Sequence, residues 1–243
     1  GNFDGVHLGH QKLFKLANNY KKNFNLNIGV LTFEPMPKMF FNKDIKNFRI
    51  SNINQKNIIL KSLGVDFIIT QKFNKKFSKI KSDFFIKEIL SKKLEAKYIF
   101  VSNNFRFGNK REGNVNQLIK NEKLHDYKIV KPKPLILGQK VISSTYIRSL
   151  LEKGDLKKTN KLLGRNWSIE GIVKKGRQQG KKIGFPTCNI DIKDSVIARP
   201  GVYAVKVKRK NFNKPLKAIA NLGYRPTFNQ KKILLEVHIF NFS

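Results

Sequence analysis

The sequence GNFDGVHLGH (residues 1–10) combines glycines and two histidines in a turn that leads into a helical pattern. Glycines let the backbone approach an anion closely, and the first turn of a helix presents oriented N–H groups. His7 and His10, three positions apart, can face the same pyrophosphate. The pattern favours a phosphate-binding loop, and the alternative is a glycine-rich turn with two solvent-exposed histidines.

Short apolar runs of strand length alternate with helical patterns after this turn. The predicted strands are LNIGVLTF (26–33), VDFIIT (65–70) and KYIFVS (97–102). Apolar residues recur at helical spacing after the opening turn, from Ile53 to Leu63, and again after Ser82. Strands that alternate with helices predict a Rossmann-like α/β domain with a doubly wound parallel sheet.

The pattern changes near Trp167 to short strands separated by glycine-rich turns. The strand-like runs are residues 168–174, 201–208, 217–222 and 233–242. With no helical stretch among them, these runs predict an all-β domain of the barrel or sandwich type. We place the N-terminal domain at residues 1–152, a linker helix at 153–166 and the β domain at 167–243.

Three segments of the N-terminal domain carry groups suited to nucleotide binding. ISSTYIR (142–148) places hydroxyl groups at a helix start and an arginine one turn later, which together can clamp a phosphate. NNFRFG (103–108) follows a predicted strand, and ligands of doubly wound sheets bind beyond the carboxyl ends of strands. TFEPMP (32–37) lies at another strand end, where prolines stiffen the loop. Taken singly, the first two are also explained as a helix cap and as a loop whose phenylalanines fill the core.

The β domain has an anion-binding pattern of its own in KKGRQQGKKIG (174–184). Its glycines recur every four residues among basic side chains, so the backbone can wrap a polyphosphate. Thr187 and Asn189 lie two apart on extended backbone, so they share one face and offer oxygen ligands to Mg²⁺. Glu236, a carboxylate in an apolar strand, can take a proton from a hydroxyl group. An ordinary hairpin and a solvated strand glutamate are the alternatives.

Basic residues dominate the charge, because 50 Lys and Arg against 16 Asp and Glu give +34 over 243 residues. Such an excess invites a nucleic-acid interpretation. Lysine supplies 41 of the 50 residues, scattered singly or in pairs, and accompanies many Asn, Ile and Phe, as codons rich in A and T would produce. We therefore attribute most of the charge to coding bias and expect no nucleic-acid partner.

The cysteine count and the hydropathy exclude several other classes of protein. The single cysteine, Cys188, cannot form an internal disulfide, and no cluster of Cys and His has zinc-site spacing. A reducing cytoplasm is therefore the expected location. No run of about 18 apolar residues is present, so no membrane span is expected. The sequence leaves the oligomeric state open.

Taken together, these segments resemble the bacterial bifunctional riboflavin kinase/FAD synthetase family, whose second activity is that of an FMN adenylyltransferase. The matching segments, in the family's order, are GNFDGVHLGH, TFEPMP, NFRFG, ISSTYIR, GFPTCN, RPGVYAV, NLGYRPTF and LEVHIF. The HxGH element also occurs in other nucleotidylyltransferases and in class I aminoacyl-tRNA synthetases. The combination of GFPTCN, NLGYRPTF and EVH is what singles out the flavokinase.

The resemblance implies two ATP-dependent reactions: phosphorylation of riboflavin to FMN in a flavokinase-type β-barrel, and adenylylation of FMN to FAD, with release of pyrophosphate, in the N-terminal domain. It implies that Glu236 activates the terminal ribityl hydroxyl of riboflavin and that Thr187 and Asn189 hold Mg²⁺. It also implies that His7 and His10 stabilise charge on the phosphates. The nucleotide-binding residues that it implies are Asn2, Phe3, Asp4, Gly5, Gly9, Asn104, Arg106, Ser144, Thr145, Arg148, Gly176, Gly180, Gly184 and Pro186.

Some positions depart from the family pattern. Met36 stands where the family usually has His, Cys188 replaces a usual Ala, and Asn241 stands where an acidic residue is common. The chain begins at the first motif and ends at Ser243, so we expect a fragment without the first strand and without the last strand and helix of the kinase domain. The rival interpretations are a monofunctional nucleotidylyltransferase with an inactive β domain and a basic nucleic-acid-binding protein.

We predict that this chain binds nucleic acid only diffusely and at low salt. Scattered lysines bind a polyanion through counterion release, so the affinity for a random duplex should fall about 10³-fold between roughly 50 and 200 mM salt. The affinity for Mg-ATP should fall far less, because directional hydrogen bonds and metal coordination hold it. Paired salt titrations measure both affinities. Sequence-selective duplex binding that survives the higher salt concentration contradicts the enzyme interpretation.

Overall fold

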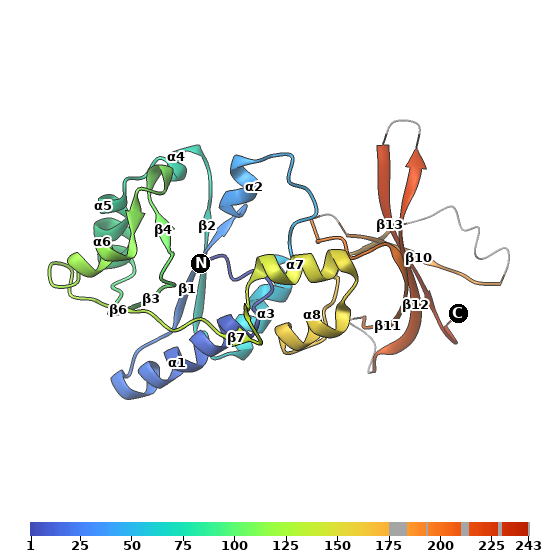
Figure 1. Cartoon of the computed structure of the whole chain (residues 1–243), viewed down its shortest axis with the longest axis horizontal. Helices are drawn as coiled ribbons and strands as arrows, with labels where there is room; N and C mark the ends of the chain where they lie inside the picture. The colour runs from blue at the N-terminus through green and yellow to red at the C-terminus, as the bar shows by residue number, and fades with distance from the viewer. Residues whose placement is uncertain (175–183, 193, 210–213, 228–229, 243) are drawn as a thin grey trace. The chain divides into compact units, whose positions relative to one another are not determined.

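The computed structural model describes residues 1–174, 184–192, 194–209, 214–227 and 230–242 (Figure 1). The chain folds into two compact units. Unit 1 comprises residues 1–45 and 56–143, and unit 2 comprises residues 46–55 and 144–243. None of the helices in the described ranges has both the length and the apolar character needed to cross a membrane.

Unit 1 alternates helices with short strands. Its α-helices are α1 (Leu8–Phe24), α2 (Pro37–Phe41), most of α3 (Ile53–Ser62), α4 (Lys75–Ser78), α5 (Ser82–Phe84) and α6 (Val115–Lys120). The other helical segments are the π-helix η1 (Phe85–Lys93) and the 3₁₀-helix η2 (Asn109–Arg111). Its strands are β1 (Gly29–Glu34), β2 (Phe67–Lys72), β3 (Tyr98–Phe100), β4 (Arg106–Phe107), β5 (Gly113–Asn114), β6 (Lys128–Val130), β7 (Ile136–Leu137) and β8 (Lys140–Val141). This alternation agrees with the α/β class that the sequence predicts.

The two longest strand pairs of unit 1 are parallel. β1 pairs with β2 along its whole length, starting with Gly29 opposite Phe67, and β3 pairs with β6. In the described part of the chain β1 and β3 do not pair, so the strands form two separate ladders and not one continuous sheet. The amino group of Gly1 donates to the carbonyl of Leu31 at 2.7 Å, so the opening loop starts beside β1.

Side chains pack against both faces of β1. Val30 belongs to a buried cluster with residues of α1 and α3, whereas Leu31 packs against a second cluster built on η1 and α6. The first cluster is Val6, Phe14, Ala17, Ile28, Val30, Leu60 and Val65. The second is Phe85, Ile86, Leu90, Val101, Phe107, Val115, Leu118 and Tyr127. Successive residues of a strand face opposite sides, and burial of both sides is what a parallel sheet between helices requires.

Unit 2 joins two helices to an antiparallel sheet. Its elements are α7 (Ser144–Lys153), α8 (Leu156–Leu163), β9 (Ile172–Lys174), β10 (Cys188–Asp191), β11 (Gly201–Val207), β12 (Leu216–Thr227) and β13 (Gln230–Ile239). The strand order is β11-β12-β13-β10-β9, and all neighbours are antiparallel. A barrel closes only where its two edge strands pair, and β9 and β11 do not pair within the described residues. This part is therefore an open sheet, and the expected closed barrel is not observed.

The segment 46–55 is built into unit 2 although most of that unit lies about a hundred residues later in the sequence. The backbone N–H of Arg49 donates to the carbonyl of Asp194 at 2.8 Å. The indole Nε1–H of Trp167 donates to the carbonyl of Ile50 at 3.0 Å. The domain limits predicted from the sequence follow chain order and do not assign the segment 46–55 to the second domain. These limits stay a prediction.

We predict that Leu60→Ala destabilises unit 1. Leu60 has no exposed surface and packs in the cluster that covers β1, so its truncation should lower the free energy of unfolding by about 2–5 kcal/mol. The control is Leu124→Ala at a leucine that is 76% exposed, for which the change should stay within about 0.5 kcal/mol. Urea denaturation followed by circular dichroism measures both. Equal losses in the two variants contradict the assigned core.

Candidate active sites

The opening loop of unit 1 contains backbone angles that are unfavourable in isolation and that tertiary packing must stabilise. Phe3, Gly5 and Val6 have positive φ angles of 48°, 76° and 37°. The N–H of Val6 donates to the carbonyl of Phe3 at 3.1 Å, which closes a turn. A positive φ is strained for a β-branched residue, and Val6 is fully buried in the cluster beside β1. Burial of Val6 therefore compensates the strain and fixes the shape of the loop.

His7 and His10 lie together where this loop enters α1. His7 is the N-cap residue of α1, and the two imidazole rings stack with centroids 3.7 Å apart and an interplanar angle of 19°. Phe3 presents an edge-on contact to His10, with centroids 5.1 Å apart. His7 is only 5% exposed, so the alternative of two solvent-exposed histidines is wrong.

Burial decides the charge of His10. The pKa of His10 lies well below its ordinary value, first because burial disfavours the imidazolium and second because His7 is adjacent. The Nδ1 atom of His10 is buried and makes no hydrogen bond within the described residues. Buried polar atoms are normally hydrogen-bonded, so an unbonded ring nitrogen is a candidate for bonding to a ligand. His10 is therefore a neutral imidazole in a fixed position, and its Nδ1 atom has unused hydrogen-bonding capacity within the described residues.

Other residues of the predicted phosphate loop differ in exposure. Asn2 is exposed, whereas Asp4 is buried. A Cβ atom added to Gly9 would lie 3.1 Å from Nδ1 of His7 and 3.4 Å from the carbonyl oxygen of Ile142. The backbone just before α7 thus passes beside the start of α1, and a side chain at position 9 would crowd both neighbours.

The predicted clamp of Ser144, Thr145 and Arg148 lies on α7, in unit 2. Ser144 begins the helix, Thr145 is exposed and Arg148 is half-buried. The Nε–H of Arg148 donates to the carbonyl of Phe48 at 2.8 Å, and the guanidinium carbon lies 3.6 Å from the centroid of the Phe48 ring. Phe48 therefore fixes the direction of the guanidinium group.

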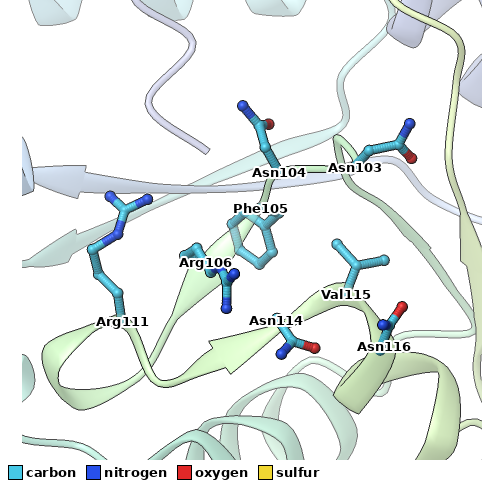
Figure 2. A pocket seen from close by; sticks show the side chains of 8 residues that line it. All are labelled: Asn103, Asn104, Phe105, Arg106, Arg111, Asn114, Val115 and Asn116. Atoms are coloured by element: carbon cyan, nitrogen blue, oxygen red, sulfur yellow. The ribbon is translucent and has the colours of Figure 1, made fainter.

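A hollow of about 520 Å³ contains two of the predicted nucleotide-binding residues (Figure 2). Asn104 and Arg106 line it, on the loop after β3 and on β4. Asn103 and Phe105 of the same predicted segment also line it. The lining residues that the sequence did not predict are Arg111, Asn114, Val115 and Asn116. Two arginines and no carboxylate among all the lining residues make the hollow suited to an anion.

Two further features of unit 1 were not predicted from the sequence. Lys56, one of 41 lysines, is only 4% exposed, and its Nζ donates to the hydroxyl of Thr32 at 2.9 Å. Phenylalanine rings also gather where β1 and β2 end, with neighbouring centroids between 5.2 and 5.9 Å apart. The cluster consists of Phe33, Phe40, Phe41, Phe73 and Phe77. Met36 beside it is buried, so this departure from the family pattern is a core side chain.

In unit 2, strand register brings two predicted site residues together. Asn189 of β10 lies opposite Glu236 of β13, and Asn221 of β12 lies opposite Glu236 on its other side. Directly paired residues point to the same face of a sheet with Cβ atoms about 4.5–5.5 Å apart. Asn221 was not predicted as a site residue. It lies within NLGYRPTF, which supported only the resemblance to the family.

Asn189 also meets a physical test for a metal ligand. Its Oδ1 atom is buried and accepts no hydrogen bond within the described residues. Thr187, two residues earlier, is exposed and shares its face. An uncharged oxygen that lacks a donor suits a hard cation such as Mg²⁺. The pair therefore fits the metal role that the sequence predicts.

The loop before Thr187 is described only in part. Gly184 has a positive φ of 81°, and the carbonyl of Pro186 accepts a hydrogen bond from His238. The predicted nucleotide-binding residues Gly176 and Gly180 lie outside the described residues.

Two family models match the chain, one for FAD synthetase over residues 1–146 and one for riboflavin kinase over residues 163–243. Among curated relatives, the bifunctional riboflavin kinase/FMN adenylyltransferase of Buchnera aphidicola (subsp. Schizaphis graminum) is 42% identical, over 100% of this chain and 78% of the relative. The proteins of the same name from Haemophilus influenzae and Escherichia coli K12 are 38% and 36% identical, over 100% and 99% of this chain and 79% and 77% of the relatives.

A solved structure from Streptococcus pneumoniae is similar over 100% of this chain and 79% of its own, with 30% identity and a TM-score of 0.86. Its title names a macrolide-efflux protein. Neither family model and none of the relatives just named carries that description.

We predict that His10 is neutral at pH 7 in the ligand-free chain. His7→Gln removes the second largest of the three causes that lower its pKa and leaves burial, the largest, in place, so the pKa should rise yet stay below 6.5, its ordinary value. Since the unfolded state then binds more protons near pH 6, this group should make stability fall as the pH drops below 6.5. An NMR pH titration of the ring measures the pKa. Titration of wild-type His10 at or above 6.5 contradicts the assignment.

Proposed function

We propose residue roles from the premise that this chain belongs to the bifunctional riboflavin kinase/FMN adenylyltransferase family. The chain phosphorylates riboflavin to FMN and adenylylates FMN to FAD, with ATP as the second substrate of both reactions. Each compact unit contains its own candidate catalytic groups, and this observation supports the assignment of one reaction to each unit. We assign adenylylation to residues 1–152 and phosphorylation to residues 167–243, with a linker helix at 153–166.

In the adenylylation reaction, an oxygen of the FMN phosphate attacks the α-phosphorus of ATP and pyrophosphate leaves. We assign His7 and His10 the role of hydrogen-bond donors to the phosphate oxygens. The neutral state of His10 supports this role, because an arriving polyanion raises the pKa of an imidazole and draws a proton onto it. Each such donor is worth about 2–4 kcal/mol of transition-state stabilisation.

The remaining nucleotide contacts of this reaction follow from the predicted residues. Asn104 and Arg106 line a hollow without a carboxylate, which supports contact with an anionic substrate. Ser144, Thr145 and Arg148 are assigned to the polyphosphate, and Phe48 keeps the guanidinium group oriented. The residues of the loop that we assign to the nucleotide are Asn2, Phe3, Asp4, Gly5 and Gly9.

The phenylalanine cluster at the ends of β1 and β2 supports a place for the flavin ring of FMN. Phe41 is 68% exposed and makes edge contacts with Phe40 and Phe73. An exposed ring held by neighbouring rings offers a planar, apolar contact to a planar ligand at little cost in conformational entropy. The packing of Val30 and Leu31 on opposite sides of β1 supports a doubly wound arrangement, in which helices cover both sides of the parallel strands.

In the kinase reaction, we assign Glu236 as the base that takes the proton of the terminal ribityl hydroxyl, whose oxygen then attacks the γ-phosphorus of ATP. Asn189 and Thr187 are the residues that would hold Mg²⁺, which neutralises charge on the phosphates when bound. Gly184 and Pro186 are assigned to the nucleotide with Gly176 and Gly180. Asn189 and Glu236 pair directly across β10 and β13, which argues against an inactive β domain. The free Cys188 supports a cytoplasmic location.

We predict that the two activities separate by mutation. In the full-length protein, Glu236→Gln should abolish FMN formation and leave conversion of FMN to FAD nearly intact, whereas His7→Ala should slow FAD formation by about 10²–10³-fold and leave FMN formation intact. The control is Glu152→Gln, at an exposed glutamate of α7. Separation of flavins by HPLC measures both products. Loss of both activities in either variant contradicts the two-site assignment.

A further inference from the structure

His238 lies beside the kinase residues and has no role in the assignments above. It follows Glu236 by two positions on β13, so both side chains point to the same face of the sheet. Nδ1 of His238 lies 2.8 Å from the carbonyl oxygen of Pro186. A carbonyl oxygen can only accept, so Nδ1 carries the hydrogen and donates.

Neighbouring rings hold this imidazole in place. Phe185 meets it edge-on at a centroid distance of 5.6 Å, and Phe240 does so at 5.7 Å, with interplanar angles of 72° and 76°. Two edge contacts leave the ring little freedom to turn away from Pro186. The direction of the Nδ1–H bond is therefore set by the fold.

The bond acts where the backbone ladder between β10 and β13 ends. The first residue of β10 is Cys188, which pairs with Val237 and ends the ladder on the side of Pro186. Proline has no N–H group and cannot extend such a ladder by donating. The side chain of His238 instead bonds the carbonyl of Pro186, so Thr187 lies between two anchored residues.

We propose that His238 is the positioning residue of the kinase site: its Nδ1–H holds the carbonyl of Pro186 and thereby fixes Thr187 and Asn189 for the magnesium–nucleotide complex. The inference rests on the proposed kinase function of this sheet face. Groups that hold metal ligands in place typically contribute 10–100-fold in metal affinity or activity. His238 acts on the loop and not on the reacting atoms, so its loss should weaken binding more than turnover.

Three variants of the full-length protein test the proposal. His238→Gln moves the donor out of reach of Pro186 and should raise KM for Mg-ATP in FMN formation at least about tenfold, with kcat changed far less. His238→Asn keeps an N–H donor near the position of Nδ1 and should recover most of this loss. The control is Ile239→Val, which shortens the neighbouring side chain on the opposite face of β13 and keeps both the hydrogen bond and the ring contacts of His238, so KM should stay within about twofold.

NMR of the ligand-free protein gives a readout that needs no turnover. Ring ¹⁵N shifts of His238 should show a protonated Nδ1, and the amide signals of Thr187 and Cys188 should move in His238→Gln but not in Ile239→Val. An unprotonated Nδ1, a wild-type KM in His238→Gln, or equal effects of His238→Gln and Ile239→Val overturns the positioning role alone. FMN formation by Glu236→Gln overturns the kinase assignment, and the positioning role with it.

Discussion

Parallel pairing of β1 with β2 is the constraint from which the rest of unit 1 follows. Parallel strands need a long crossover, and residues 35–66 supply it, with α3 as its last helix. Both faces of such a strand must be buried, which sends Val30 and Leu31 into different clusters. The carboxyl ends of both strands then meet at one edge, and Thr32 with Lys56 and the phenylalanine cluster lie there. The position of the candidate flavin contact is a consequence of strand direction.

The features that the sequence predicted are those that leave a local pattern. The apolar runs 26–33 and 65–70 overlap β1 and β2, the run 97–102 contains β3, and the hydroxyl-rich start at Ser144 begins α7. What the sequence could not predict depends on contacts between distant residues. The bond from Arg49 to Asp194 spans more than a hundred positions and leaves no periodic signal. Lys56 likewise bonds to Thr32, 24 positions earlier in the sequence. The residues adjacent to Lys56 do not distinguish it from the exposed lysines.

For the site residues too, local patterns allowed predictions, whereas contacts between distant residues did not. Spacing alone placed Thr187 and Asn189 on one face, because a strand alternates with a period of two. That Asn189 faces Glu236 depends on the register of β10 against β13, which a hydrophobic pattern does not specify from one strand alone. The charge of His10 was also beyond the sequence, since its lowered pKa comes from burial and from a stacked neighbour. A chain with a net charge of +34 thus presents a neutral imidazole to its anionic substrates.

Aromatic rings orient the nitrogen groups of both candidate sites. Phe3 meets the edge of His10, Phe48 lies under the guanidinium of Arg148, and Phe185 and Phe240 enclose His238. A phenylalanine ring has few rotatable bonds and no hydrogen-bonding atoms, so it fixes a planar group without competing for its N–H donors. The 20 phenylalanines of this chain therefore include rings that hold nitrogen groups of the candidate sites in fixed directions.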